Sequence, residues 1–152
     1  MSLSKKHHMK IAITSGYFDP MHRGHLELLN LSKAQGDKLW VIVNNDVQAA
    51  LKKGKAFIDQ DTRLAVTTAL RVVDRAILAI DQDGSVCATL EVLIKEAKAQ
   101  GHDVVFCKGG DRNAGNIPEM TVLQKYGAHL IDGLGAKIDS SSRIIAEAKN
   151  KI

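Results

Sequence analysis

The segment "GYFDPMHRGHLELL", Gly16–Leu29, joins a hydrophobic stretch to an amphipathic one and holds two histidines, His22 and His25, three residues apart. The residues just before it, Lys10–Thr14, form a short apolar run rich in β-branched side chains, which predicts a buried strand. In the following "HLELLNLSKAQG", apolar residues recur on one helical face until Gly36 ends the pattern. The segment therefore predicts a strand, a tight turn and a helix, with both histidines at the start of the helix.

The same alternation of strand and helix continues along the chain. Its apolar runs are nearly continuous, which is typical of parallel strands covered on both faces. Further strands are expected at Lys38–Asn45, Arg75–Ile80, Asp103–Gly110 and Ala128–Leu134, and further helices at about 61–72 with Asp61 as N-cap, 85–101, 117–127 and 140–152. This pattern predicts a single α/β domain, Rossmann-like, with a parallel sheet of about five strands flanked by helices.

The length of 152 residues favours one domain. Residues 1–8 precede an in-frame Met9 and are expected to be a leader or a disordered N-terminus, with the domain at 9–152. The chain has neither an apolar run of membrane-spanning length nor the apolar core of a signal peptide. We therefore expect a cytoplasmic protein with no membrane partner.

Charge and cysteine content narrow the class of partner. The net charge is +4, from 21 basic and 17 acidic residues, and only 4% of residues are aromatic. Without a basic stripe or a stacking platform, this excess predicts a pocket for a small anion and no nucleic-acid partner. Cys87 and Cys107 fit no metal-binding pattern and are expected to be free thiols, with Cys107 in the core.

Polar clusters follow the predicted strands where each strand ends. In parallel sheets, ligands bind beyond the carboxyl ends of the strands. We therefore expect four segments to converge at that edge: Gly16–His25, Asn44–Asp46, Lys108–Arg112 and Ser140–Ser142. His102 and His129 stand at strand starts, so they are expected at the surface of the opposite edge.

The two histidines have three interpretations. Zinc sites on helices use i, i+4 spacing and a third ligand, which the sequence does not offer here, so no metal site is expected. A role in capping and packing the helix start is the second interpretation. The third is anion binding, because a helix N-terminus attracts phosphate and imidazoles donate hydrogen bonds to its oxygens. Gly24 between them allows close approach of a ligand, and we favour the third interpretation.

"GYFDPMHRGH" resembles the GxFDxxHxGH signature of the cytidylyltransferase-like nucleotidyltransferases, which share their fold with class I aminoacyl-tRNA synthetases. "AFIDQDTRLAVTTALRVVD" is similar to a family segment in which an arginine opens a helix. "VVFCKGGDR" resembles the KGGD stretch of heptose-phosphate adenylyltransferases, and "IDSSSRII" stands where members carry a serine-rich helix start. The resemblance covers nearly all of residues 10–150.

The resemblance implies a mechanism without a covalent enzyme intermediate. A phosphate oxygen of the acceptor attacks the α-phosphorus of a nucleoside triphosphate, and Mg²⁺ accompanies the triphosphate. His22 and His25 would stabilise the transition state, together with Lys52 or Lys53 of a "KKGK" cluster that also contains Lys55. The alternative for these lysines is a solvated loop.

The resemblance also assigns binding residues. Asp19 is expected to fix the turn and not to act as a general base. The residues expected to bind the nucleotide are Gly16, Tyr17, Phe18, Asp19, Gly24, Lys108, Gly109, Gly110, Asp111, Ser140, Ser141 and Ser142. The residues expected to bind the acceptor are Asn45, Arg63, Arg112 and Asn116; for Arg63 the alternative is a surface charge in the first turn of a helix.

The implied function is transfer of a nucleoside monophosphate, AMP in preference to CMP, to a phosphorylated small molecule. A sugar phosphate, as in ADP-heptose and lipopolysaccharide-core precursor synthesis, is the expected acceptor. The chain departs from the heptose enzymes at "KGGDRNAGNIPE", where they carry an aromatic residue after KGGD. The alternatives are a cytidylyltransferase acting on a polyol phosphate, an FAD-synthase-like adenylyltransferase and a nucleotide-binding sensor without turnover. The family also leads us to expect a homodimer.

Overall fold

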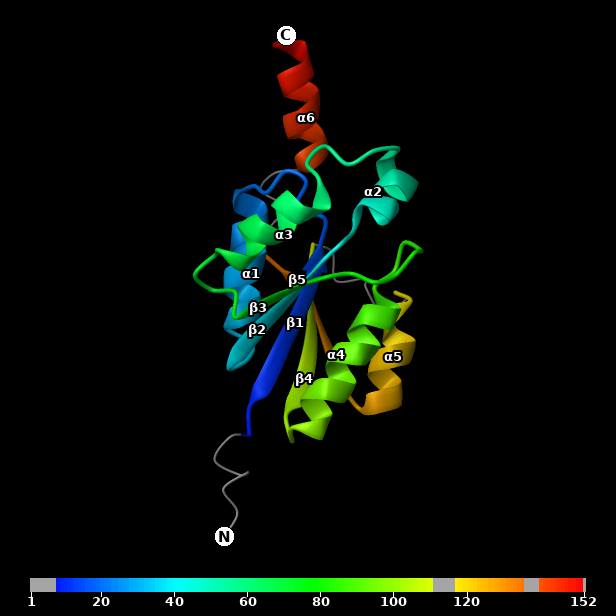
Figure 1. Ribbon diagram of the computed structural model, residues 1–152. Helices are drawn as coiled ribbons and strands as arrows, with labels where there is room; N and C mark the ends of the chain where they lie inside the picture. Colours follow the sequence, from blue (N-terminus) through cyan, green and yellow to red (C-terminus); the bar gives the residue numbers. More distant parts are fainter. Residues whose placement is uncertain (1–7, 111–116, 136–139, 152) are drawn as a thin grey trace.

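A parallel sheet forms the centre of the computed structural model, which describes residues 8–110, 117–135 and 140–151. Within these residues the strand order is β3-β2-β1-β4-β5, and every neighbouring pair is parallel (Figure 1). The strands are β1 (Lys10–Gly16), β2 (Lys38–Val43), β3 (Arg75–Leu78), β4 (Asp103–Gly109) and β5 (His129–Leu134). Because the chain order reverses direction at β1, the carboxyl ends of β1 and β4 flank the point where a doubly wound sheet binds its ligands.

Helices cover both faces of the sheet. Helices α1 (Arg23–Lys33) and α3 (Gln60–Thr68) lie on one face, and α4 (Cys87–Ala99) and α5 (Glu119–Tyr126) lie on the other (Figure 1). Helices α2 (Asp46–Lys53) and α6 (Ser141–Asn150) lie beyond the carboxyl ends of the strands, near the top of the view (Figure 1). These two helices therefore border the edge at which the polar clusters were predicted to meet.

Alternating residues of β1 pack into two hydrophobic cores, one on each face of the sheet. Ile11 and Ile13 pack in a cluster with Leu90 of α4, while Ala12 packs on the other face in a cluster with Leu29 of α1. Because both faces are buried, the strand has no polar alternation, and its continuous hydrophobicity in the sequence is explained.

The predicted fold class and strand count are confirmed within the described residues, and the main differences lie around residues 46–62. Helix α2 is absent from the predicted elements, although Asn45 and Gln48 form a capping box that marks its start. Asp61 was predicted as the N-cap of the next helix, and this is wrong: Asp59 caps α3, which ends at Thr68. The Asp59 carboxylate accepts from the backbone N–H of Thr62 in the first turn of the helix. Asp61 already lies within this turn and therefore cannot be its N-cap.

The prediction for His102 is also wrong. The residue is only 5% exposed, and its Nδ1 accepts from the backbone N–H of Met9. His129 is exposed, as expected. Cys107 lies in the core, as predicted, and burial raises the pKa of its thiol to about 11. Residues 1–7 of the expected leader lie outside the described residues, while His8 contacts the Gly101 carbonyl oxygen at 2.6 Å.

Candidate active site

A cavity of about 690 Å³ opens at the carboxyl ends of β1 and β4. Its volume lies in the range of small-molecule sites. Four groups of predicted residues contribute to its walls: the loop after β1, the end of α2, the end of β4 and the start of α6. The predicted residues that line it are Gly16, Tyr17, Phe18, Asp19, His22, Gly24, His25, Lys52, Lys53, Lys108, Gly109, Gly110, Ser140, Ser141 and Ser142.

The loop after β1 turns sharply to form one wall. Phe18 adopts a left-handed backbone conformation with φ 53°, and its ring is buried beneath the loop. A Cβ atom at Gly16 would lie 2.7 Å from that ring, so only glycine fits this position without displacing Phe18. The Gly-x-Phe spacing of the motif is therefore a packing requirement of the turn.

Asp19 holds the loop after β1 to the segment that follows α2. Its carboxylate is fully buried, accepts from the backbone N–H groups of Phe57 and Ile58, and lies 2.5 Å from the Lys53 ammonium. Burial alone would raise the pKa of Asp19, but the hydrogen bonds from Lys53 and the two N–H groups hold it below its ordinary value. Asp19 is thus a charged anchor of the loop, the role expected of it.

His22 and His25 form a stacked pair at the N-terminus of α1, with ring centroids 3.8 Å apart. Nδ1 of His22 accepts from the backbone N–H of Gly24, and Nδ1 of His25 accepts from the backbone N–H of His22. A nitrogen that accepts carries no proton, so the His25 ring, when neutral, holds its proton on Nε2. For His25 the capping interpretation and the anion interpretation are therefore compatible, because capping uses Nδ1 and the proton is carried by the other ring nitrogen.

The pKa of His25 is lowered to about 4, first by burial and then by the neighbouring His22 and Lys52. At neutral pH the ring is therefore an uncharged hydrogen-bond donor. The edge of the ring also packs against Phe18, with centroids 5.1 Å apart, which fixes its orientation.

This lowered pKa predicts a specific pH dependence of stability in the free protein. Between the ordinary pKa of 6.5 and about 4, the unfolded chain protonates His25 while the folded chain does not. The contribution of His25 to the free energy of unfolding should therefore be fully present above pH 6.5 and should decrease as the pH falls to 4. We expect His25→Asn to lose this part of the decrease, measured by urea unfolding of both proteins at pH 7, 5 and 4. Parallel curves, or an NMR titration midpoint of His25 near 6.5, would contradict the prediction.

Three lysines make the cavity cationic. Lys52 and Lys53 come from the end of α2, and Lys108 from the end of β4. The Lys52 ammonium lies 4.4 Å from the centroid of the Tyr17 ring. Burial lowers the pKa of Lys52, and the nearby charges of Lys53 and Lys108 lower it further. Such mutual repulsion is relieved by a polyanion, so the cluster favours phosphate groups.

The start of α6 faces the same cavity. Ser140 is the N-cap of the helix and accepts from the backbone N–H of Arg143. The Ser141 hydroxyl donates to the Pro20 carbonyl oxygen at 3.0 Å, which ties α6 to the loop after β1. Two helix N-termini, those of α1 and α6, thus border one cationic cavity, an arrangement suited to a chain of phosphates.

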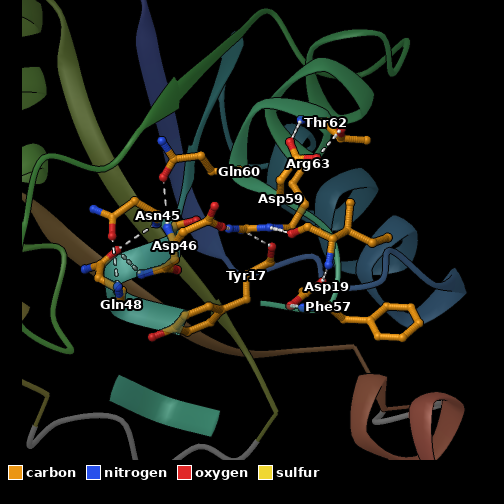
Figure 2. Close-up of polar contacts among 12 residues, drawn as sticks. Tyr17, Asp19, Asn45, Asp46, Gln48, Phe57, Asp59, Gln60, Thr62 and Arg63 are labelled. Atoms are coloured by element: carbon orange, nitrogen blue, oxygen red, sulfur yellow. Dashed lines mark hydrogen bonds and ion pairs between the residues drawn. The ribbon is translucent and has the colours of Figure 1, made fainter. Parts of the chain in front are cut away.

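Two predicted acceptor residues do not line the cavity. Arg63 is 2% exposed. Its guanidinium donates hydrogen bonds to groups of the protein itself, which are the Tyr17, Asn44 and Ile58 carbonyl oxygens and the Asp46 carboxylate. Figure 2 shows its guanidinium between Asp46 and the Tyr17 backbone. The surface alternative for Arg63 is excluded by this burial, and its contacts give it a structural role.

Asn45 has a structural place as well. Its side-chain oxygen caps α2 through the backbone N–H of Gln48, and its amide donates to the Ala79 and Asp81 carbonyl oxygens. The predicted site residues Asp111, Arg112 and Asn116 lie outside the described residues.

Several cavity residues were not predicted. They come mainly from the starts of α4 and α5, and they include Gly84, Val86, Ile117, Pro118 and Glu119, while Asn44 lines the cavity as expected for its segment. The sequence could have indicated them by their position, because helices that follow strands in a parallel sheet begin at the carboxyl edge of the sheet.

Within the described ranges, no group of three or more His, Cys, Asp or Glu side chains is arranged to hold a metal ion. In the same ranges, none of the helices has the length and apolar character needed to span a membrane.

Comparison with known proteins agrees with this geometry. A family model described as cytidylyltransferase-like matches residues 13–146. The bifunctional protein HldE of Pseudomonas fluorescens (strain Pf0-1) is 32% identical over 150 residues, which are 97% of this chain and 29% of that protein. HldE of Ectopseudomonas mendocina (strain ymp) is 31% identical over 151 residues, 97% of this chain and 30% of that protein. The chain thus spans about 30% of the length of these relatives.

A solved structure is similar over most of its length. The crystal structure of the lipopolysaccharide core biosynthesis protein from Thermoplasma volcanium GSS1 matches with a TM-score of 0.60 and 28% sequence identity. The match covers 86% of this chain and 99% of that chain. The likeness therefore extends over most of the α/β domain.

Proposed function

The chain belongs to the cytidylyltransferase-like family of nucleotidyltransferases, and on this premise we propose that it transfers a nucleoside monophosphate to a phosphorylated small molecule. The observation that carries the proposal is the His22–His25 pair, whose Nδ1 atoms are engaged by backbone N–H groups at the start of α1. A neutral His25 imidazole fixed in this way presents an N–H donor at a helix N-terminus, where negative charge is stabilised.

The proposed reaction is a single displacement at phosphorus. An oxygen of the acceptor phosphate forms a bond to the α-phosphorus of the triphosphate. The bond from that phosphorus to the oxygen bridging it to the β-phosphate breaks, and pyrophosphate leaves with the electron pair. No protein nucleophile is needed, so catalysis rests on position and charge. His22 and His25 would donate to the oxygens on which charge accumulates.

The cationic cavity supports this division of roles. Lys52, Lys53 and Lys108 line it together with the serines at the start of α6. We assign the triphosphate to the space between α1 and α6, and the acceptor phosphate to the side of α2. The lysines and the two helix N-termini would then offset the charges of both substrates.

Mg²⁺ is proposed to arrive with the triphosphate. The carboxylates on the described cavity walls are Asp19 and Glu119, and each accepts hydrogen bonds from backbone N–H groups. This donor set fits a metal held mainly by phosphate oxygens and water, as Mg²⁺ commonly is in phosphoryl-transfer sites. The metal would neutralise part of the phosphate charge.

The acceptor proposed is a sugar phosphate, and AMP is favoured over CMP as the transferred group. The proposal is supported by the KGGD-type end of β4, by the similarity to HldE and by the printed title of the Thermoplasma volcanium structure, which names lipopolysaccharide core biosynthesis. A homodimer, expected from the family resemblance, and a cytoplasmic location, expected from the composition of the sequence, are also part of the proposal. Light scattering of the purified protein tests the first of them.

Pyrophosphate release tests the proposed function. The protein is incubated with Mg²⁺ and either ATP or CTP, with a panel of sugar phosphates, polyol phosphates and FMN. We expect release that depends on both nucleotide and acceptor, fastest with ATP and a sugar phosphate. Each reaction without acceptor is the control. Tight nucleotide binding without turnover on any acceptor would contradict the proposal and favour the sensor interpretation.

A further inference from the structure

The wall of the cavity opposite the histidines differs from the rest. It is built where α4 and α5 begin, and its side chains include the apolar Val86, Ile117 and Pro118. An apolar wall is a poor site for phosphate and a good one for a flat ring, because it removes ring surface from water. The cavity thus has a cationic part and an apolar part.

A single acidic side chain, Glu119, lies in the apolar part. It is 6% exposed, and its Oε2 atom accepts from the backbone N–H of Val86 at 2.9 Å. Among the residues that the structure describes, its second oxygen, Oε1, has no hydrogen-bond partner. Oε1 is reached from the cavity that Glu119 lines, so a ligand that fills the cavity displaces the water at this oxygen and is favoured when it brings a hydrogen-bond donor.

The chemistry of the substrate identifies that donor. In a nucleoside triphosphate the ribose separates the base from the phosphates, so a triphosphate in the cationic part would extend its base toward the apolar part. Adenine and cytosine carry exocyclic amino groups, which donate N–H bonds to a carboxylate oxygen. Hypoxanthine and uracil carry a keto oxygen at the same ring positions, and its lone pairs would face the Glu119 oxygen.

We propose that Glu119 is a specificity-determining residue that selects nucleoside triphosphates whose base carries an exocyclic amino group and rejects their keto counterparts. This inference rests on the proposed function, because it takes the ligand of the cavity to be a nucleoside triphosphate. It adds to that function a means of base selection at the start of α5.

The substitution Glu119→Gln tests the proposal because it reverses the hydrogen bond without removing the side chain. The Gln oxygen still accepts from the Val86 N–H, so the amide NH₂ group faces the cavity and becomes a donor. The wild type should prefer ATP to ITP, or CTP to UTP, by about 10-fold or more in kcat/KM. In Glu119→Gln that ratio should fall at least about 10-fold, with improved use of the keto nucleotide.

The matched control is Glu91→Gln, a change of the same kind on α4, at a residue that pairs with Lys125 and does not line the cavity. It should leave the ATP/ITP ratio unchanged. Binding of ATP and ITP to each protein by calorimetry gives a second readout. If no acceptor supports turnover, the proposed function fails, while the binding ratio still tests Glu119.

Two results would overturn the proposal. One is a folded Glu119→Gln protein with the wild-type ratio of amino to keto nucleotides in both turnover and binding. The other is an unchanged nucleotide ratio with a raised KM for the acceptor, which would place Glu119 against the acceptor and not the base.

Discussion

Replacing His25 with Ala is expected to lower kcat by roughly 100- to 1,000-fold, equivalent to about 3–4 kcal/mol of transition-state stabilisation. Nucleotide affinity should change by less than about 10-fold, because the ground-state triphosphate keeps the lysines and both helix N-termini. His22→Ala should act in the same direction. Asn at position 25 supplies a neutral donor and should restore part of the rate. Steady-state kinetics and nucleotide titration of each variant measure the two effects.

The matched control for these variants is His129→Ala, at an exposed residue that begins β5 at the opposite edge of the sheet. It should retain wild-type kinetics. A capping role alone predicts a different outcome for His25→Ala: a lower melting temperature, with activity lost only in proportion to folded protein. Wild-type turnover in a folded His25→Ala protein would contradict the proposed mechanism.

The second large effect is expected from Arg63→Met, which should lower the free energy of unfolding by about 3–5 kcal/mol. The substitution leaves the Tyr17, Asn44 and Ile58 carbonyl oxygens without their donors and removes the partner of Asp46. Methionine fills similar space, so the loss would reflect hydrogen bonds more than packing. Urea unfolding of the variant and the wild type measures it.

The control for this prediction is Arg71→Met, at an exposed arginine just after α3, which should change stability by less than about 0.5 kcal/mol. The loops joined by Arg63 include Tyr17 of the cavity wall, so Arg63→Met should also reduce activity while folded. A stability change below about 1 kcal/mol together with a selective rise in the acceptor KM would instead support the acceptor-binding role predicted from the sequence.

Local patterns explain what the sequence alone could predict. The strand, turn and helix around Gly16–Leu29 follow from a buried run, a glycine turn and a helical period, all within one short segment. The convergence of separate clusters follows from a general property of parallel sheets. That property predicts the loop after β1, Lys108 and the serines of α6 at one edge of the sheet, and all three line the cavity.

Long-range contacts explain what the sequence could not predict. Arg63 looked like a binding residue because nothing in its own segment shows that two distant carbonyl oxygens, those of Tyr17 and Asn44, accept from its guanidinium. Helix α2 is short, and besides the local capping box its Asn45 is held by hydrogen bonds to the Ala79 and Asp81 carbonyl oxygens, which follow β3. The role proposed for Glu119 could not be recognised because it depends on the start of α4 meeting the start of α5.

The protein is proposed to transfer a nucleoside monophosphate directly to an acceptor phosphate. The most direct test of this transfer follows the label from α-³²P-labelled ATP and CTP, with Mg²⁺ and a sugar phosphate, in a single turnover of the wild-type protein. We predict that the label moves into a nucleotidyl sugar, that one pyrophosphate forms for each labelled product, and that no label remains on the protein. Label that stays in the triphosphate with every acceptor, or that is covalently attached to the protein, would contradict the account.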